Sequence, residues 1–320
     1  MEKRPLGRTG LLVSPIGFGT SPLGSMPGTY GYEVSERRAV ETLHTIFASP
    51  VNLIDTSRNY GSGRSEERVG AALASYGRPT DHLVLSTKVD REMESLRFDA
   101  ARVRQSFEES LEALRVDRVD ILHLHDPEYG RDLGEITADG GAIDEVFKIR
   151  EEGLARSVGL AMGQIELMFR LLQQYPFDVA LNHNRFTALN RQAEEMYSYA
   201  HEQGMGILNA APYAGGVLAK GSDQATMVTY QEATEETIAP VRALEALCAR
   251  HGVPMGAAAL QFSTRDARIA STVLGVSKPD RVTQSIEWAT LDIPEEFWAE
   301  FAAIPYSTDD PEANRVYSPD

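Results

Sequence analysis

The sequence predicts an α/β protein, a (β/α)₈ TIM barrel preceded by a short N-terminal β-hairpin. Eight short apolar runs alternate with helix-like stretches along the 320 residues, as expected for parallel strands that are buried on both faces. Three of these runs end in an ionisable residue, which is the position that α/β barrels use for chemistry. An open doubly wound sheet is the alternative. It needs a G-x-G-x-x-G turn after the first strand, and Gly17-Phe18-Gly19-Thr20 does not match that pattern.

The elements follow from residue patterns along the chain. Gly7 and Gly10 punctuate the segment from Pro5 to Ser14, which favours a small hairpin. The strand candidates are residues 15–19, 52–56, 83–89, 119–125, 157–161, 179–184, 206–210 and 272–276. Helical spacing of apolar residues predicts helices that begin at Ser35 and Ser65, and others over residues 99–114, 143–152, 165–174, 192–203, 237–251, 255–264 and 279–289.

Two segments fall outside this alternation. Residues 212–236 follow the seventh strand, have weak periodicity and contain several glycines. A long loop at the catalytic face often binds or covers a ligand, and a plain surface insertion is the alternative. The polar tail, residues 305–320, is expected either to be flexible or to lie over the barrel mouth. We find no linker or composition break, so residues 1–320 are interpreted as one domain.

Charge and composition limit the class of partner. The net charge is −16 with no long basic run, which argues against nucleic acid or an anionic membrane as a partner. An anionic cofactor stays compatible because it needs only a few local donors. Cys248 is the single cysteine, so no intrachain disulfide can form. The first residues lack the apolar core of a signal peptide and no run reaches 18 apolar residues. We therefore expect a cytoplasmic protein.

Four polar residues form the candidate catalytic set. Asp55, Lys88 and His125 end the second, third and fourth apolar runs, and Tyr60 follows Asp55 by five residues. A carboxylate, an amine, an imidazole and a phenol that converge at one face suit proton transfer near neutral pH. A phenol has a free pKa of about 10, and a nearby lysine cation is expected to lower it.

Each of these residues has an ordinary structural interpretation when it is taken alone. Asp55 could cap a helix, Tyr60 could belong to the core or a loop, and Lys88 could be a surface lysine at a strand end. His123 competes with His125, because strand alternation places both on the same face.

In order, these residues resemble the motifs of the aldo-keto reductase family. The matching segments are Asp55-Thr56-Ser57-Arg58-Asn59-Tyr60-Gly61, Leu85-Ser86-Thr87-Lys88-Val89 and Leu124-His125-Asp126-Pro127, together with Leu6-Gly7-Arg8-Thr9-Gly10-Leu11, Gly17-Phe18-Gly19-Thr20 and Gly61-Ser62-Gly63-Arg64-Ser65-Glu66-Glu67. The Pro that follows favours His125 over His123.

The resemblance implies a nicotinamide cofactor, NAD or NADP, and a role for each residue of the set. Tyr60 would be the proton donor or acceptor, and Asp55 would hold a charged Lys88. His125 would orient the substrate oxygen.

The resemblance also implies cofactor contacts. Gly19 and Thr20 would make backbone contacts, and Asn182 or Asn184 would bind the carboxamide, although a strand Asn equally fills a polar gap in a core. The other expected contacts are Gly215, Gly216 and Leu218 on the pyrophosphate side, and Gly275, Ser277, Lys278 and Arg281 at the adenosine end. Solvated helix charges are the alternative for Lys278 and Arg281.

Three departures from the family pattern leave the choice between NAD and NADP open. Gly159-Leu160-Ala161-Met162 lacks the Ser and Asn that usually contact the nicotinamide. Ala210 replaces a stacking Tyr, and Gly275 stands where a phosphate-binding Lys is common.

Several segments resemble the aldose 1-dehydrogenase, L-galactose dehydrogenase and pyridoxal dehydrogenase branch. They are Gly61-Ser62-Gly63-Arg64-Ser65-Glu66, Leu85-Ser86-Thr87-Lys88-Val89, Leu124-His125-Asp126-Pro127, Phe177-Asp178-Val179-Ala180-Leu181 and Arg185-Phe186-Thr187-Ala188-Leu189. That branch implies oxidation of a cyclic hemiacetal, so the expected substrate is a sugar or another small carbonyl compound. A broad aldehyde or ketone reductase and a nicotinamide-binding regulatory subunit are the alternatives, and the oligomeric state stays open.

Overall fold

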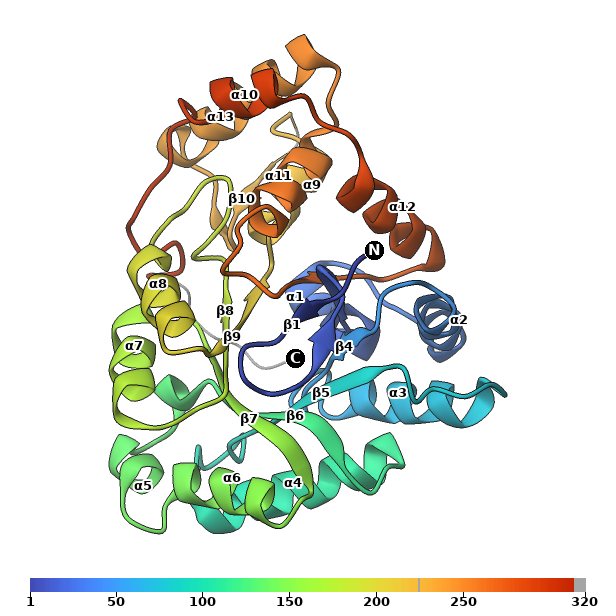
Figure 1. Ribbon diagram of the computed structural model, residues 1–320, viewed down its shortest axis with the longest axis vertical. Helices are drawn as coiled ribbons and strands as arrows, with labels where there is room; N and C mark the ends of the chain where they lie inside the picture. Colours follow the sequence, from blue (N-terminus) through green and yellow to red (C-terminus); the bar gives the residue numbers. More distant parts are fainter. Residues whose placement is uncertain (224, 314–320) are drawn as a thin grey trace.

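The computed structural model describes residues 1–223 and 225–313, and eight of its strands close into a parallel barrel (Figure 1). The strand order around the barrel is β12-β3-β4-β5-β6-β7-β8-β9, and Thr272 of β12 pairs with Ile16 of β3 to close it. The strands are β3 (Ile16–Gly19), β4 (Leu53–Asp55), β5 (Val84–Val89), β6 (Val119–His125), β7 (Ala155–Met162), β8 (Val179–His183), β9 (Gly206–Ala210) and β12 (Ser271–Gly275). The predicted (β/α)₈ barrel is confirmed.

The helices surround the barrel, with α10 and α13 at the upper end of Figure 1. Ser35 accepts a hydrogen bond from the Arg38 backbone N–H, and Asp99 caps its helix in the same way through Arg102. The longer helices are α2 (Glu36–Phe47), α3 (Arg64–Ser75), α4 (Ala100–Leu114), α6 (Ala142–Glu151), α7 (Ile165–Gln174), α8 (Glu194–Glu202), α10 (Glu235–His251), α11 (Met255–Thr264), α12 (Pro279–Thr290) and α13 (Glu295–Phe301). Short helical turns are η1 (Ser21–Gly24), α1 (Pro27–Tyr30), η2 (Pro127–Tyr129), α5 (Leu133–Thr137), η3 (Ala214–Gly216) and α9 (Val217–Lys220).

The predicted N-terminal hairpin forms from β1 (Arg4–Pro5) and β2 (Leu12–Val13). Leu6 and Val13 belong to the apolar cluster inside the barrel, together with Leu53 of β4. Gly7 has φ +51°, and a Cβ atom there would lie 2.3 Å from the Gly206 backbone nitrogen. Glycine is therefore required where the hairpin turns against β9.

Strand alternation separates the barrel interior from the helix layer. Ile121 on β6 lies in the interior apolar cluster, whereas Leu122 and Leu124 lie in the outer core. His123 and His125 therefore face inward with Ile121. Because all barrel strands are parallel, their carboxyl ends gather at one face, and the candidate residues at strand ends meet there.

The two segments that interrupted the predicted alternation are both structured where the structure describes them. Residues 212–236 contain η3, α9 and a hairpin of β10 (Met227–Val228) and β11 (Gln231–Glu232). The tail packs on the segment after β8, because the Ser307 backbone N–H donates to the Leu189 carbonyl at 2.9 Å. The expectation of a tail over the barrel mouth holds for residues 305–313, and residues 314–320 lie outside the described residues.

Within the described ranges, we find no helix with the length and apolar character needed to cross a bilayer.

Candidate active site

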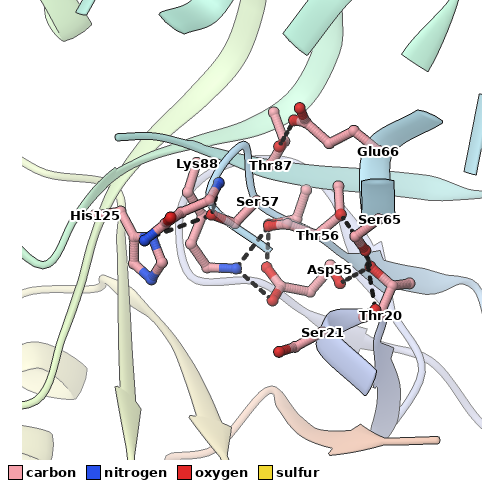
Figure 2. A network of polar contacts seen from close by, with 12 residues as sticks. Thr20, Ser21, Asp55, Thr56, Ser57, Ser65, Glu66, Thr87, Lys88 and His125 are labelled. Atoms are coloured by element: carbon pink, nitrogen blue, oxygen red, sulfur yellow. Dashed lines mark hydrogen bonds and ion pairs between the residues drawn. The ribbon is translucent and has the colours of Figure 1, made fainter. Parts of the chain in front are cut away.

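Asp55 and Lys88 form a buried ion pair at the carboxyl ends of β4 and β5 (Figure 2). The Lys88 Nζ donates to Asp55 Oδ2 at 2.6 Å and to the Thr56 carbonyl at 2.7 Å. Ser86 Oγ donates to the other carboxylate oxygen at 2.8 Å. A buried charge needs such partners, because desolvation of an unpaired ion costs several kcal/mol. The pair holds the lysine amine in one place.

Tyr60 lies against both the lysine and the histidine. Lys88 Nζ is 4.7 Å from the centre of the Tyr60 ring, and the Tyr60 and His125 rings meet edge to face with centroids 5.7 Å apart. The turn after Tyr60 depends on Gly61, which has φ +61°. A Cβ atom on Gly61 would lie 2.2 Å from the Gly24 carbonyl oxygen. This close backbone contact fixes Tyr60 against η1.

His125 is oriented by a carboxylate that we did not single out from the sequence. The His125 Nδ1 lies 2.7 Å from Asp90 Oδ1, and Ser57 Oγ donates to Asp90 Oδ2 at 2.6 Å. The Asn59 backbone N–H donates to the same oxygen at 2.9 Å. With Nδ1 committed to Asp90, Nε2 is the nitrogen left for a substrate oxygen. It lies 3.7 Å from Asp126 Oδ2, which is beyond hydrogen-bond distance. Asp90 directly follows β5, so its position at a strand end could have identified it as a candidate from the sequence.

The carboxylates raise the pKa of His125. Burial alone would lower that pKa, but the charges of Asp126 and Asp90 and the hydrogen bond to Asp90 outweigh it. Burial of Asp90 opposes its ionisation, yet the charge and hydrogen bond of His125 hold its pKa below the ordinary value. The two groups stabilise each other's charged forms.

The sequence-based expectation of a lowered pKa for Tyr60 is wrong for this structure. Desolvation raises the pKa of the Tyr60 phenol well above its ordinary value, and the Asp55 carboxylate adds to that shift. Lys88 does not reverse it, because its charge is already neutralised by Asp55 at 2.6 Å. Tyr60 is therefore protonated near neutral pH and is ready to donate a proton.

His123 lies deeper in the barrel than His125. Neither ring nitrogen has a hydrogen-bond partner in the described chain. Gly159 makes room for the ring, since a Cβ atom there would lie 2.4 Å from His123 Nδ1. Burial, with Lys88 and His125 adding like charge, lowers the pKa of His123 well below its ordinary value. His123 is therefore a neutral interior residue.

At the end of β3, Gly19 pairs with Gly275 of β12, so two residues without side chains lie side by side at the mouth. Thr20 is fully buried, and its hydroxyl lies 3.1 Å from the Asp55 carbonyl oxygen and 2.8 Å from Ser65 Oγ. Thr20 thus joins β3 to β4 and α3. Its backbone groups are paired as well, because its N–H donates to the Asp55 carbonyl at 2.8 Å and its carbonyl accepts from the Leu23 N–H and Ser65 Oγ.

Asn182 and Asn184 occupy different environments. Asn182 Nδ2 donates to the carbonyls of Met162 and Gly163 at 2.7 and 3.1 Å and lies 3.7 Å from the Met168 sulfur on α7. Its side chain therefore faces the helix layer, which favours the alternative of a polar gap filled by a strand Asn. Asn184 has φ +62° and donates to Glu312 Oε1 at 2.8 Å.

The turn after β9 contains Gly215 and Gly216 at φ +73° and +101°. A Cβ atom on Gly215 would lie 3.1 Å from the Thr229 backbone nitrogen, so glycine admits the β10–β11 hairpin here. The Leu218 side chain is fully buried in an apolar cluster, and its N–H donates to Tyr213. The turn is open to a ligand at the glycines, whereas Leu218 contributes packing.

The end of β12 and the start of α12 fit the phosphates of a dinucleotide. Gly275 is exposed and Ser277 is half-buried. The exposed Lys278 is the N-cap residue of the 12-residue helix α12, which lacks a side-chain cap, and the exposed Arg281 lies in its first turn. Free N–H groups and the helix dipole favour an anion at such an end. Tyr213 Oη, buried near Arg281, has no partner among the described residues, so a polar ligand atom would satisfy it.

Comparison with known proteins identifies the family. A model of the Aldo/keto reductase family matches residues 15–305. The chain belongs to the aldo/keto reductase family. The chain is 33% identical to L-galactose dehydrogenase of Arabidopsis thaliana over 311 residues, covering 95% of this chain and 94% of that protein. It is 30% identical to D-threo-aldose 1-dehydrogenase of a Pseudomonas species, covering 92% and 94%. Pyridoxal 4-dehydrogenase of Microbacterium luteolum is also 30% identical, covering 93% and 95%.

Solved structures agree on the fold. The holo form of aldo-keto reductase AKR11C1 from Bacillus halodurans superposes with a TM-score of 0.79 at 22% identity, covering 99% of this chain and all of that one. Glycerol dehydrogenase AKR11B4 from Gluconobacter oxydans gives a TM-score of 0.73 at 22% identity, covering 95% and 94%.

This aldo/keto reductase is an oxidoreductase that uses NAD or NADP and acts on small carbonyl compounds or sugars. The family and the branch predicted from the sequence are confirmed.

Proposed function

We propose that this aldo/keto reductase oxidises the anomeric hydroxyl of a sugar, or of a similar cyclic hemiacetal, to a lactone. The geometry that supports it most is the arrangement of His125 between Asp90 and Tyr60. Asp90 holds Nδ1 at 2.7 Å, and the Tyr60 ring meets the imidazole edge to face. His125 Nε2 and the Tyr60 hydroxyl are then the two groups left to contact one substrate oxygen. The three sugar and pyridoxal dehydrogenases of similar sequence favour a hemiacetal as that substrate.

In the proposed reaction, a bound nicotinamide would supply the hydride acceptor for the anomeric carbon. Tyr60 takes the proton from the anomeric hydroxyl, and His125 donates a hydrogen bond to that oxygen. The Asp55–Lys88 ion pair fixes the lysine amine 4.7 Å from the centre of the Tyr60 ring and neutralises the Asp55 carboxylate, whose charge would otherwise oppose the phenolate that oxidation requires. For the cofactor, we infer contacts from the glycines of the mouth and from Ser277, Lys278 and Arg281, where the exposed helix end fits phosphates.

Reduction of an aldehyde or ketone is the second candidate, and the protonation of Tyr60 favours it. Because the pKa of Tyr60 is raised by desolvation, the proton donor needed for reduction predominates at neutral pH. Oxidation needs the deprotonated phenol, so its rate should rise with pH. The two directions are therefore expected to have opposite pH dependence.

A panel of L-galactose, other aldoses, pyridoxal and simple aldehydes, assayed with NAD and NADP in both directions, tests the proposal. We expect lactone formation from an aldose to have the highest kcat/KM, with the lactone identified by chromatography. A higher kcat/KM for simple aldehydes would favour the reductase. No turnover with any substrate, despite cofactor binding, would favour the regulatory subunit that the sequence left open.

We further infer that residues 1–320 form one domain. We also infer that the protein works in the cytoplasm, because its single cysteine is consistent with a reducing compartment. Limited proteolysis of the purified protein and cell fractionation test these two points.

A further inference from the structure

A cavity of about 790 Å³ is formed by four segments that are far apart in the sequence. They are α1, residues 187–190 after β8, the β10–β11 hairpin with the start of α10, and residues 307–311 of the tail. The volume is within the range of about 300–1,000 Å³ that is usual for small-molecule sites. The cavity lining does not include the four catalytic candidates. The cavity therefore suits the part of a ligand that is remote from the reacting atom.

Hydrogen bonds fix the cavity wall to the catalytic face of the barrel. On one side, Tyr30 of α1 donates to Ser21 Oγ at 2.8 Å, directly after β3. On the other, Glu312 of the tail lies 3.2 Å from His183 Nε2, at the end of β8. Tyr30 is also close enough to Tyr60 to act on its phenol electrostatically. The cavity therefore lies over the strand ends, beside the proton donor.

The charged side chains that line the cavity are all acidic. Glu232, Glu236 and Asp309 line it, are exposed, and form no ion pair within the described residues. Asp310 also lines it but is paired with Arg185 at 2.7 Å. None of the described lining residues is Lys or Arg. Such a wall gives a negative potential that repels anions.

This wall differs from the edge that suits the dinucleotide phosphates. Lys278 and Arg281 lie at the start of α12, and neither lines the cavity. The phosphates of the cofactor have a basic site there, so the acidic cavity is left for the substrate.

Two buried threonines on the cavity wall have hydroxyls that donate to no group within the described residues. Thr187 and Thr229 are 1% and 5% exposed, and no described group accepts a hydrogen bond from either hydroxyl. Thr187 Oγ1 only accepts, from the Leu189 backbone N–H at 3.1 Å. Buried polar groups are normally paired, so these donors are available to oxygen atoms of a ligand. Thr229 and Tyr230, at φ +49° and +64°, also hold the hairpin turn in a conformation that usually needs Gly or Asn.

On the basis of the proposed function, we propose that this cavity holds the part of the substrate remote from the reacting carbon. It selects uncharged, hydroxyl-bearing groups and rejects anionic groups such as carboxylates. The donor hydroxyls of Thr187 and Thr229 bind the substrate oxygens, and Glu232, Glu236 and Asp309 oppose a negative charge.

Binding of two inert sugar analogues to the full-length protein with its cofactor tests this selection. Methyl galactoside and methyl galacturonoside are blocked at the anomeric oxygen and differ by a hydroxymethyl group against a carboxylate. By calorimetry at low salt, we expect the neutral glycoside to bind at least about tenfold more tightly, which corresponds to about 1.4 kcal/mol. Added salt should narrow the difference, because it screens exposed charges. Equal affinities at low salt, or tighter binding of the uronoside, would overturn the selection.

The experiment remains interpretable if the proposed reaction is wrong, because neither glycoside can react. Failure of the proposed function would appear as absent turnover of free aldoses, whereas failure of this inference would appear as a lost difference between the glycosides. If neither glycoside binds up to high concentration, the assignment of the cavity to a sugar is wrong.

A matched pair of triple variants separates the cavity charges from the charge of the whole protein. E232Q/E236Q/D309N should bring the two affinities to within about threefold. E108Q/E112Q/E151Q makes the same change in net charge at exposed positions on α4 and α6, and should keep the original difference. If both variants reduce the difference equally, the selection comes from overall charge and the cavity assignment fails.

Thr229→Ala should weaken binding of methyl galactoside without lowering the melting temperature, and unchanged affinity would remove this hydroxyl from the site.

Discussion

Asp90 Oδ1 lies 2.7 Å from Nδ1 of His125, and this contact sets which nitrogen of the imidazole faces the substrate. Asp90 is itself held by Ser57 Oγ and by the Asn59 backbone N–H. The carboxylate acts on the reaction through the imidazole, so we interpret Asp90 as a positioning residue.

Asp90→Asn keeps the shape of the side chain and removes its charge. Hydrogen bonds to charged groups contribute about 1.5–3 kcal/mol, so we expect kcat/KM to fall by about 10- to 100-fold. The pKa of His125 should also fall, because Asp90 helps to raise it. NMR titration of the histidine beside steady-state kinetics measures both effects. A lower kcat/KM with an unchanged His125 titration would show that Asp90 acts by another route.

Tyr60→Phe removes the ionisable oxygen and keeps the ring against His125. General acid–base catalysis contributes about 10²–10⁴-fold, so turnover should fall by that amount, with cofactor affinity nearly unchanged. Tyr199→Phe on α8 is the matched control and should keep normal turnover. Turnover like that of the wild type in the Tyr60 variant would exclude this phenol from the mechanism.

Lys88→Met should shift the oxidative pH–rate profile further towards alkaline pH. The Asp55 carboxylate already raises the pKa of Tyr60, and without Lys88 it loses its neutralising partner, so that pKa should rise further. The same change leaves Asp55 buried without its partner, which costs about 3–5 kcal/mol of stability.

The double variant Asp55→Asn/Lys88→Met separates these two effects. The double variant removes the unpaired carboxylate, so part of the lost stability should return, as measured by denaturant unfolding. Its oxidation rate should stay low at neutral pH. An unshifted pH–rate profile in a folded Lys88→Met protein would show that the lysine is structural.

His123 should make the protein acid-sensitive. Its lowered pKa keeps the buried ring neutral, whereas the same histidine in the unfolded chain binds a proton below about pH 6.5. The unfolded state then binds more protons, so stability falls as pH drops below that value, by up to about 1.4 kcal/mol per pH unit. His123→Leu should flatten urea stability between pH 7.5 and pH 5, and the exposed His82→Gln should leave the slope unchanged. An equally steep slope without His123 would assign it to other groups.

Cofactor preference is expected to be NAD or dual rather than strictly NADP. Gly275 offers no cation for a 2′-phosphate, although the exposed Arg281 can still contact one. Equilibrium titration with NADH and NADPH should give dissociation constants within about tenfold of each other. A hundredfold preference for NADPH that Arg281→Ala abolishes would show that Arg281 outweighs Gly275.

Local patterns in the sequence determined the barrel and the main catalytic candidates. Apolar runs of strand length and helical spacing are short-range signals, so they located the eight strands to within a few residues. Asp55, Lys88 and His125 could be found because each ends a strand, and parallel strands bring their carboxyl ends to one face. Tyr60 and the choice of His125 over His123 needed the family motif as well.

Only the tertiary structure decided the surroundings of these residues. The link from Glu312 in the tail to Arg185 spans 127 residues, and no local pattern encodes such a contact. The direction of Asn182 towards α7 depended on strand register, and the pKa of Tyr60 depended on the balance between burial, Asp55 and an already neutralised Lys88. Desolvation and charge interactions are sums over all neighbours in space, so they become definite only once the chain has folded.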